Sequence, residues 1–133
     1  MHGHNYRVEV ELLGDELFED KVFDFLDFKP IVRAQCDKLD HCLLLPKENP
    51  HLSFERQDNQ LHITVHGKDK FSFPLEDTLL LPLRNTSVER IGTYLCQEIK
   101  KDIKEKFPAL TFGLIKTSVE ETPGQWAEYS EIY

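Results

Sequence analysis

The residues that follow the first few positions alternate in polarity, and this alternation is the strongest constraint on the fold. From Asn5 to Leu13, apolar side chains alternate with charged ones: Tyr6, Val8, Val10 and Leu12 against Arg7, Glu9 and Glu11. Successive side chains of a β-strand point to opposite faces, so one face of this segment is apolar and the other is charged. The pattern predicts a half-buried antiparallel strand that Gly14-Asp15 ends.

Two later segments have the period of amphipathic helices. The first is expected to begin with Asp27 as its N-cap and Pro30 in its first turn, and its apolar stripe continues to Leu43. The second is expected to begin at a capping box in which Thr86 and Glu89 satisfy each other's backbone donors. Its predicted buried stripe consists of Val88, Ile91, Leu95, Ile99 and Ile103.

Short extended runs fill most of the remaining chain. Residues 22–25 form one such run, and residues 52–73 read as three short strands with turns at 58–59 and 67–69. Two final strands are expected at 111–121 and 125–133, separated by Thr122-Pro123-Gly124. The order strand, helix, small strands, helix, strand, strand predicts an α+β fold with an antiparallel sheet.

Composition excludes several classes of protein. A chain of 133 residues with 40% apolar and 30% charged residues is typical of a single soluble globular domain, here expected to span residues 1–133. No apolar run approaches the roughly 20 residues of a membrane helix, so no membrane partner is expected. A net charge of -8 argues against binding nucleic acid. Three cysteines without CxxC spacing indicate free thiols in a reducing cytoplasm.

His2 and His4 are candidate metal ligands. Side chains two apart on an extended segment share a face, which brings both imidazoles within reach of one ion. An isolated HxH is more often a pair of exposed terminal histidines. The strand that begins directly after the pair favours the metal, because it would hold both side chains on a rigid edge. The residues alone supply no third ligand, which a catalytic zinc normally has.

Asp40-His41 has both a structural and a chemical interpretation. A histidine at the end of a helix interacts favourably with the helix dipole, and the aspartate beside it can simply be solvated. Alternatively, the carboxylate fixes the tautomer of the imidazole and makes it a general base near neutral pH. Taken alone, the pair favours the structural role, because catalysis depends on geometry that the sequence does not contain.

Glu121 falls at the end of a predicted strand, where an exposed acid or an ion-pair partner is the default. A carboxylate there could also accept two parallel N–H bonds from an aminopyrimidinone ring. Its neighbour Glu120 is expected on the opposite face of the strand, so only one of the two can do this.

Taken together, these segments resemble the family of 6-pyruvoyl- and 6-carboxy-tetrahydropterin synthases. The resemblance rests on residues 2–12, 22–32, 38–45, 85–95 and 118–129, in that order along the chain. It implies the tunnelling fold (T-fold), a small antiparallel sheet with two helices packed on one face. It also implies that three subunits close their sheets into a barrel and that two trimers stack into a homohexamer.

The resemblance further implies a site. Zn²⁺ would be bound by three histidines, two of which match His2 and His4, and the Asp-His pair of the family matches Asp40 and His41. The substrate-binding residues match Glu121, which would anchor the pterin, and Thr122 directly after it, in the VxET motif. The implied activity is a lyase that converts 7,8-dihydroneopterin triphosphate to a 6-carboxy- or 6-pyruvoyl-tetrahydropterin.

One part of the family pattern has no counterpart in this sequence. Family members carry a strand before HGH with the first zinc histidine, and then a loop with a catalytic cysteine or glutamate, whereas this sequence begins at HGH. The expectation is a missing first strand through truncation, with a pseudoenzyme or replacement by other residues as alternatives. The rival function is a non-catalytic homologue that binds a pterin or purine.

Overall fold

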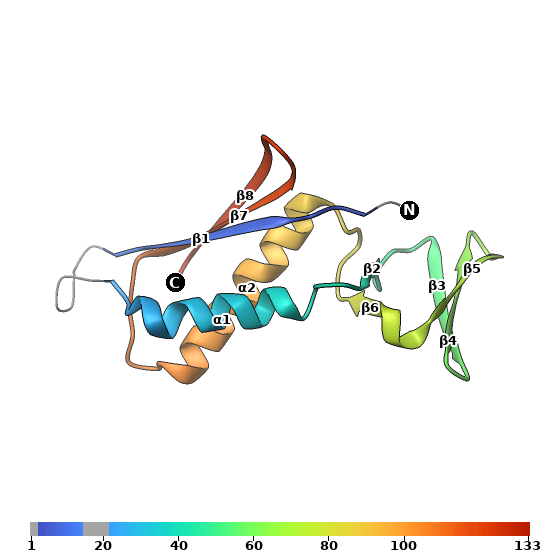
Figure 1. Cartoon of the computed structure of the whole chain (residues 1–133), viewed down its shortest axis with the longest axis horizontal. Coiled ribbons are helices and arrows are strands. Elements are labelled where there is room, and N and C mark those ends of the chain that lie inside the picture. Colours follow the sequence, from blue (N-terminus) through green and yellow to red (C-terminus); the bar gives the residue numbers. More distant parts are fainter. Residues whose placement is uncertain (1–2, 15–21) are drawn as a thin grey trace. The chain divides into compact units, whose positions relative to one another are not determined.

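A computed structural model describes residues 3–14 and 22–133 of the chain (Figure 1). The chain divides into two compact units. The first unit contains residues 1–38 and 87–133, and the second contains residues 39–86.

The first unit is built on a three-stranded antiparallel sheet. Strand β1 (Arg7–Leu13) pairs with β7 (Leu114–Thr122), which pairs in turn with β8 (Gln125–Ile132). The side chains of β1 alternate between exposed and partly buried along the whole strand, which confirms the predicted half-buried strand.

Two helices complete the core of this unit. Helix α2 (Val88–Lys106) packs against β7 and β8, and helix α1 (Phe25–Asp37) packs against α2. The buried side chains come from both helices and from β7: Phe28, Ile31, Ile91, Leu95, Ile99, Ile103, Ile115 and Val119. The predicted α+β fold, with an antiparallel sheet and two helices, is therefore confirmed.

The other face of the sheet is polar. In the strand register, Arg7, Glu9 and Glu11 of β1 lie opposite Glu120, Ser118 and Lys116 of β7. The amino group of Lys116 lies 2.6 Å from Glu11 and 3.6 Å from Glu128, so one cation links all three strands. Exposed ion pairs of this kind contribute little to stability, which leaves the apolar face as the main source of it.

Helix α1 begins earlier than its apolar pattern predicts. Asp24, rather than Asp27, is the N-cap, and the backbone N–H of Leu26 donates to its Oδ1 at 2.9 Å. Phe25 and Leu26 are 67% and 82% exposed, so the first turn contributes nothing to the buried stripe that the sequence shows. The predicted extended run at residues 22–25 is also wrong, because Phe25 already belongs to the helix.

The ends of the helices differ from prediction in two further ways. Helix α1 stops at Asp37, and Leu43 begins a strand instead of continuing the helical stripe. The N-cap of α2 is Ser87 and not Thr86. The predicted capping box is therefore wrong, because the side chain of Ser87 makes no capping hydrogen bond to the helix backbone and Glu89 is only the second residue of the helix. A hydrogen bond with the side chain of Ser87 instead lowers the pKa of the Glu89 carboxyl.

The second unit contains the predicted small strands. Strands β3 (Leu52–Gln57), β4 (Gln60–Val65) and β5 (Lys68–Pro74) form an antiparallel meander, which confirms three strands between residues 52 and 73. A short 3₁₀ turn (Leu75–Asp77) follows. The apolar cluster of the second unit is centred on Leu45, Leu61 and Ile63.

A parallel pair of strands in this unit has no counterpart in the prediction. Strand β2 (Leu43–Pro46) pairs with β6 (Thr78–Leu81), and the meander forms the connection between them. Both segments are short runs of leucine, which lack the alternation that marks a half-buried strand. Their pairing depends on a connection of more than thirty residues, which a local pattern does not show.

The cysteines agree with the expectation of free thiols. Cys36, Cys42 and Cys96 are all unbridged. Burial raises the pKa of each thiol, which makes all three poor nucleophiles. In residues 3–14 and 22–133, no helix combines the length and apolar character that crossing a membrane requires.

The α2 stripe yields a test of the core. Ile99 is fully buried, so Ile99→Ala should lower the free energy of unfolding by about 2–5 kcal/mol, as measured by urea denaturation. Gln97→Ala on the exposed side of the same helix is the control and should change the free energy by no more than about 0.5 kcal/mol. Equal effects of the two substitutions would contradict the assignment of the buried face.

Candidate functional site

The candidate site in the first unit begins at His4, three residues before the start of β1. Its Nε2 lies 3.1 Å from Oε1 of Glu121, which is near the far end of β7. The two side chains are 18% and 33% exposed, so the contact is only partly screened by water. The structure thus brings together one member of the predicted metal pair and the predicted substrate anchor, which are more than one hundred residues apart in sequence.

An irregularity in the sheet sets the position of Glu121. Glu120 pairs with Trp126 and Thr122 pairs with Gln125, so Glu121 is an extra residue on β7. Such a bulge bends the strand locally and redirects a side chain, and bulges are frequent beside functional sites. Alternation turns Glu121 to the face of His4, and the bulge leaves it without a partner on β8 at the point where the regular ladder ends.

Tyr6 is a third member of this group, and sequence reasoning did not single it out. Its ring centre lies 5.7 Å from that of His4, with the rings tilted by 59°. Burial, and then the negative charge of Glu121, raise the pKa of the Tyr6 hydroxyl. The phenol therefore stays protonated and can donate a hydrogen bond at neutral pH. The sequence did contain a signal for this residue: Tyr6 is two positions from His4 on an extended segment, so the two side chains are expected on the same face.

Thr122 lies beside this group, at the end of β7, where it pairs with Gln125 of β8. Its hydroxyl donates to Oε1 of Gln125 at 2.9 Å, so the side chain braces the base of the turn. The turn itself is Pro123-Gly124, with Gly124 at a φ of 84°. Proline followed by glycine with positive φ is the signature of a type II turn.

Glu120 points to the opposite face from Glu121, as the alternation of the strand predicts. It is 8% exposed, and its Oε1 accepts a hydrogen bond from the backbone N–H of Gly124 at 2.7 Å. Its Oε2 lies 3.4 Å from the guanidinium of Arg7. This carboxylate is therefore occupied by the protein itself, whereas Glu121 faces the His4 side.

Asp40 and His41 lie in the second unit and are paired. Nδ1 of His41 lies 2.8 Å from Oδ2 of Asp40, and the side chains of His41 and Asp40 are 92% and 65% exposed. This contact favours the tautomer with the proton on Nδ1, which leaves Nε2 as the basic nitrogen. The pair follows α1 in a turn, where His41 has a φ of 54°. Histidine is among the residues that adopt this left-handed conformation more often than most.

The described residues supply only part of a metal site. His2 lies outside them, and among residues 3–14 and 22–133 no group of three or more histidine, cysteine, aspartate or glutamate side chains is placed to hold an ion. Imidazole nitrogen and carboxylate oxygen are both ligands that zinc accepts. His4 and the adjacent Glu121 therefore fit zinc in donor type, and the predicted third ligand is not among the described residues.

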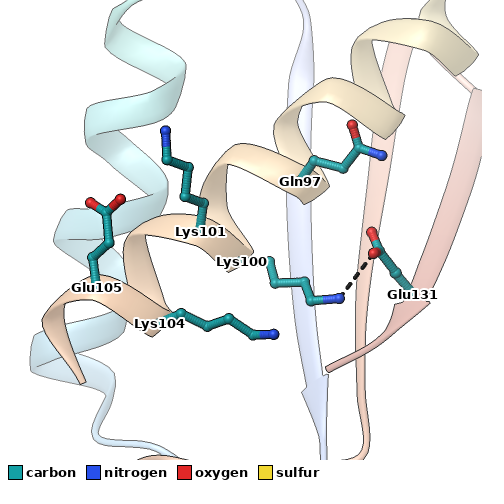
Figure 2. Close-up of a pocket in the computed structure, with 6 residues that line it drawn as sticks. All are labelled: Gln97, Lys100, Lys101, Lys104, Glu105 and Glu131. Carbon is teal, nitrogen blue, oxygen red and sulfur yellow. Dashed lines mark hydrogen bonds and ion pairs between the residues drawn. The ribbon is translucent and has the colours of Figure 1, made fainter. Parts of the chain in front are cut away.

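A surface depression of about 350 Å³ on α2 contains none of the predicted site residues. It is lined by Gln97, Lys100, Lys101, Lys104, Glu105 and Glu131 (Figure 2). The amino group of Lys100 donates to Glu131 at 2.9 Å and to the carbonyl of Ile132 at 2.6 Å. These contacts join α2 to β8, so Lys100 has a structural role.

Comparison with known proteins identifies the family. Residues 1–132 match the sequence model of the family described as 6-pyruvoyl tetrahydropterin synthase. A protein of Methanocaldococcus jannaschii named putative 6-carboxy-5,6,7,8-tetrahydropterin synthase is 38% identical over 97% of this chain and 78% of its own. A 6-carboxy-5,6,7,8-tetrahydropterin synthase of Haemophilus influenzae is 26% identical over 98% of this chain and 82% of its own.

Solved structures agree with the sequence comparison. The 6-pyruvoyl tetrahydropterin synthase of Plasmodium falciparum superposes with a TM-score of 0.91 at 32% identity, covering 99% of this chain and 82% of that protein. The enzyme of Plasmodium vivax gives a TM-score of 0.91 at 30% identity over the same shares. The α+β fold is thus that of the T-fold synthases, and the chain belongs to the 6-pyruvoyl tetrahydropterin synthase family.

Proposed function

We propose that the protein is a zinc-dependent lyase that converts 7,8-dihydroneopterin triphosphate to a 6-substituted tetrahydropterin, either 6-carboxy- or 6-pyruvoyl-tetrahydropterin. The relatives named above are tetrahydropterin synthases of both kinds. The observation that carries the proposal is the convergence of His4, Tyr6 and Glu121 at the bulge in β7. An imidazole, a phenol and a carboxylate together suit a polar heterocycle that must be held in one orientation.

In this proposal, Glu121 anchors the pterin ring. The ring presents an N–H and an exocyclic amine side by side, and one carboxylate can accept hydrogen bonds from both. Glu121 is partly buried at 33% exposure, so these bonds would form with limited competition from water. Thr122, beside it at the end of β7, contributes by fixing the end of the strand through Gln125. Holding the ring in register is the positional contribution to the rate.

The Asp40–His41 pair is the proposed proton shuttle. Asp40 orients the imidazole through Nδ1, which leaves Nε2 to take a proton from the substrate and return it. The high exposure of both side chains keeps them accessible to a substrate or to a neighbouring subunit. This pair separates the proposed enzyme from a homologue that only binds pterin, because binding needs Glu121 but not a general base.

Zinc would be held by His2 and His4 together with a third ligand outside the described residues. When bound, the metal supplies Lewis-acid polarisation of the substrate's side-chain hydroxyl groups. The contribution of this chain is to fix the His4 imidazole, which Glu121 and the Tyr6 ring both contact. A carboxylate against the ring of a metal-binding histidine commonly sets the orientation of that ring.

Assembly into a homohexamer, a dimer of trimers, is part of the proposal. In the described part of the chain, β1 and β8 are the outer strands of the sheet and present unpaired backbone groups along their edges. Pairing these edges between subunits into a closed barrel would remove them. A cytoplasmic location is also proposed, since three free thiols suit a reducing compartment.

Replacing the anchor tests the binding role directly. Glu121→Gln should weaken the binding of biopterin about tenfold or more, because one buried N–H donor loses its acceptor at a cost of about 1–3 kcal/mol. Titration followed by pterin fluorescence measures the dissociation constant. Glu9→Gln on the polar face of β1 is the charge-matched control and should bind biopterin like the unchanged protein. If both variants bind as tightly as the unchanged protein, the pterin site lies elsewhere.

Replacing the base tests whether the protein is an enzyme. His41→Asn should lower turnover of 7,8-dihydroneopterin triphosphate by about 10²–10⁴-fold and leave biopterin binding unchanged. Asparagine tolerates the positive φ of this position, so the turn is kept while the base is lost. Chromatography of the products measures the rate and identifies the product. Biopterin binding without any turnover in the unchanged protein would instead establish a non-catalytic pterin-binding homologue.

Removing the two histidines tests the metal. The double variant His2→Ala/His4→Ala should lose zinc, measured by elemental analysis of purified protein. The matched control is His62→Ala/His66→Ala in the second unit, which should retain as much zinc as the unchanged protein. Full zinc content in the first variant would refute the assignment of these two ligands.

A further inference from the structure

We infer that Glu120 is a positioning residue for the substrate anchor: by binding the Gly124 amide it holds in place the bulge in which Glu121 contacts His4. This inference rests on the proposed role of Glu121 in pterin binding and adds a second residue on which that role depends. Glu120 does not reach the His4 side of the sheet itself, since it lies on the opposite face.

The burial of Glu120 requires an explanation. It is the one charged residue among the buried polar side chains of the described chain, the others being Gln35, Thr117 and Ser118. A carboxylate is removed from water only where the protein supplies compensating donors. The two donors here are the amide of Gly124 at 2.7 Å and the guanidinium of Arg7 at 3.4 Å.

The Gly124 contact is the stronger of the two. Its distance is short and its donor is part of the backbone, so it loses little freedom when the bond forms. Arg7 is 68% exposed, and its ion pair with Glu120 is correspondingly screened by solvent. The geometry therefore assigns the carboxylate chiefly to the turn between β7 and β8.

The contact encloses the bulge. It joins the side chain of residue 120 to the backbone of residue 124, so Glu121, Thr122 and Pro123 lie in the loop that it closes. The extra residue of a bulge has no ladder partner of its own, and the register shift of β7 lies within this loop. Without the clamp, the loop keeps only the Thr122–Gln125 pairing at its base, and the direction of Glu121 is no longer fixed.

Two substitutions at position 120 separate the hydrogen bond from the charge. Glutamine retains an oxygen that accepts the bond from Gly124 and gives up only the charge that faces Arg7. Alanine removes the acceptor altogether. Glu128→Ala is a control on the same polar face, since Glu128 is exposed and contacts Lys116 and Ser118 instead of the turn.

Biopterin titration gives the first measurement. Glu120→Ala should weaken binding about fivefold or more, whereas Glu120→Gln and Glu128→Ala should bind within about twofold of the unchanged protein. Because Glu120 acts through Glu121, Glu120→Ala should cause little further loss in a Glu121→Gln background. Unchanged binding in Glu120→Ala, equal losses in the alanine and glutamine variants, or fully additive losses in the double variant would overturn the inference.

Hydrogen exchange gives a measurement that needs no ligand. In Glu120→Ala, the backbone amides of Glu121, Thr122 and Gly124 should exchange faster, while the amides of helix α2 should be unchanged. In Glu120→Gln, the amides of the turn should exchange as in the unchanged protein. If Glu121→Gln does not affect biopterin, the proposed function fails, and exchange alone then decides whether the clamp exists. Equal exchange of the turn in the alanine variant and the unchanged protein would overturn the clamp whatever the ligand does.

Discussion

The antiparallel pairing of β1 with β7 is the interaction on which the candidate site depends. Its register places Arg7 opposite Glu120 and Val8 opposite Val119, so the residues before β1 extend past the end of the regular ladder. His4 and Tyr6 consequently meet Glu121 where the bulge begins. A slip of one residue would move every side chain of β1 to the other face and separate these groups. Burial favours this register, since the partly buried side chains of β1 are all apolar and its charged side chains are exposed.

The periodicity of apolar residues correctly predicted those elements in which a single period continues from one end to the other. The alternation after Asn5 gave β1 correctly, and the buried stripe of α2 from Ile91 to Ile103 is as the spacing requires. The errors occur where a boundary is set by exposed residues. Phe25 and Leu26 form the first turn of α1 without contributing to its core, so the pattern points to Asp27 although the cap is Asp24. The pairing of β2 with β6 has no local signal at all, because it joins segments far apart in sequence.

The candidate site was predictable to a similar degree. Alternation alone places Glu120 and Glu121 on opposite faces, and adjacency alone brings Asp40 to His41, at 2.8 Å in the structure. The assignment of roles to these residues came from the resemblance to the family. Neither source predicts the contact between His4 and Glu121, because it depends on the register of two distant strands. The bulge is equally absent from the sequence pattern, since Thr122-Pro123-Gly124 marks a turn but not the extra residue before it.

The two neighbouring glutamates show how environment, and not residue type, divides their roles. Glu120 is buried and its oxygens meet a backbone amide and a guanidinium, so its charge is compensated within the protein. The side chain of Glu121 is three times as exposed as that of Glu120, at 33% against 11%, and it contacts the imidazole of His4. A carboxylate whose oxygens are bound by the protein, such as Glu120, can hold the turn in place. A partly exposed carboxylate such as Glu121 can accept hydrogen bonds from a substrate. The proposed site requires a carboxylate that holds the turn next to a carboxylate that binds the substrate. The alternation of a β-strand provides this by turning two consecutive side chains to different faces.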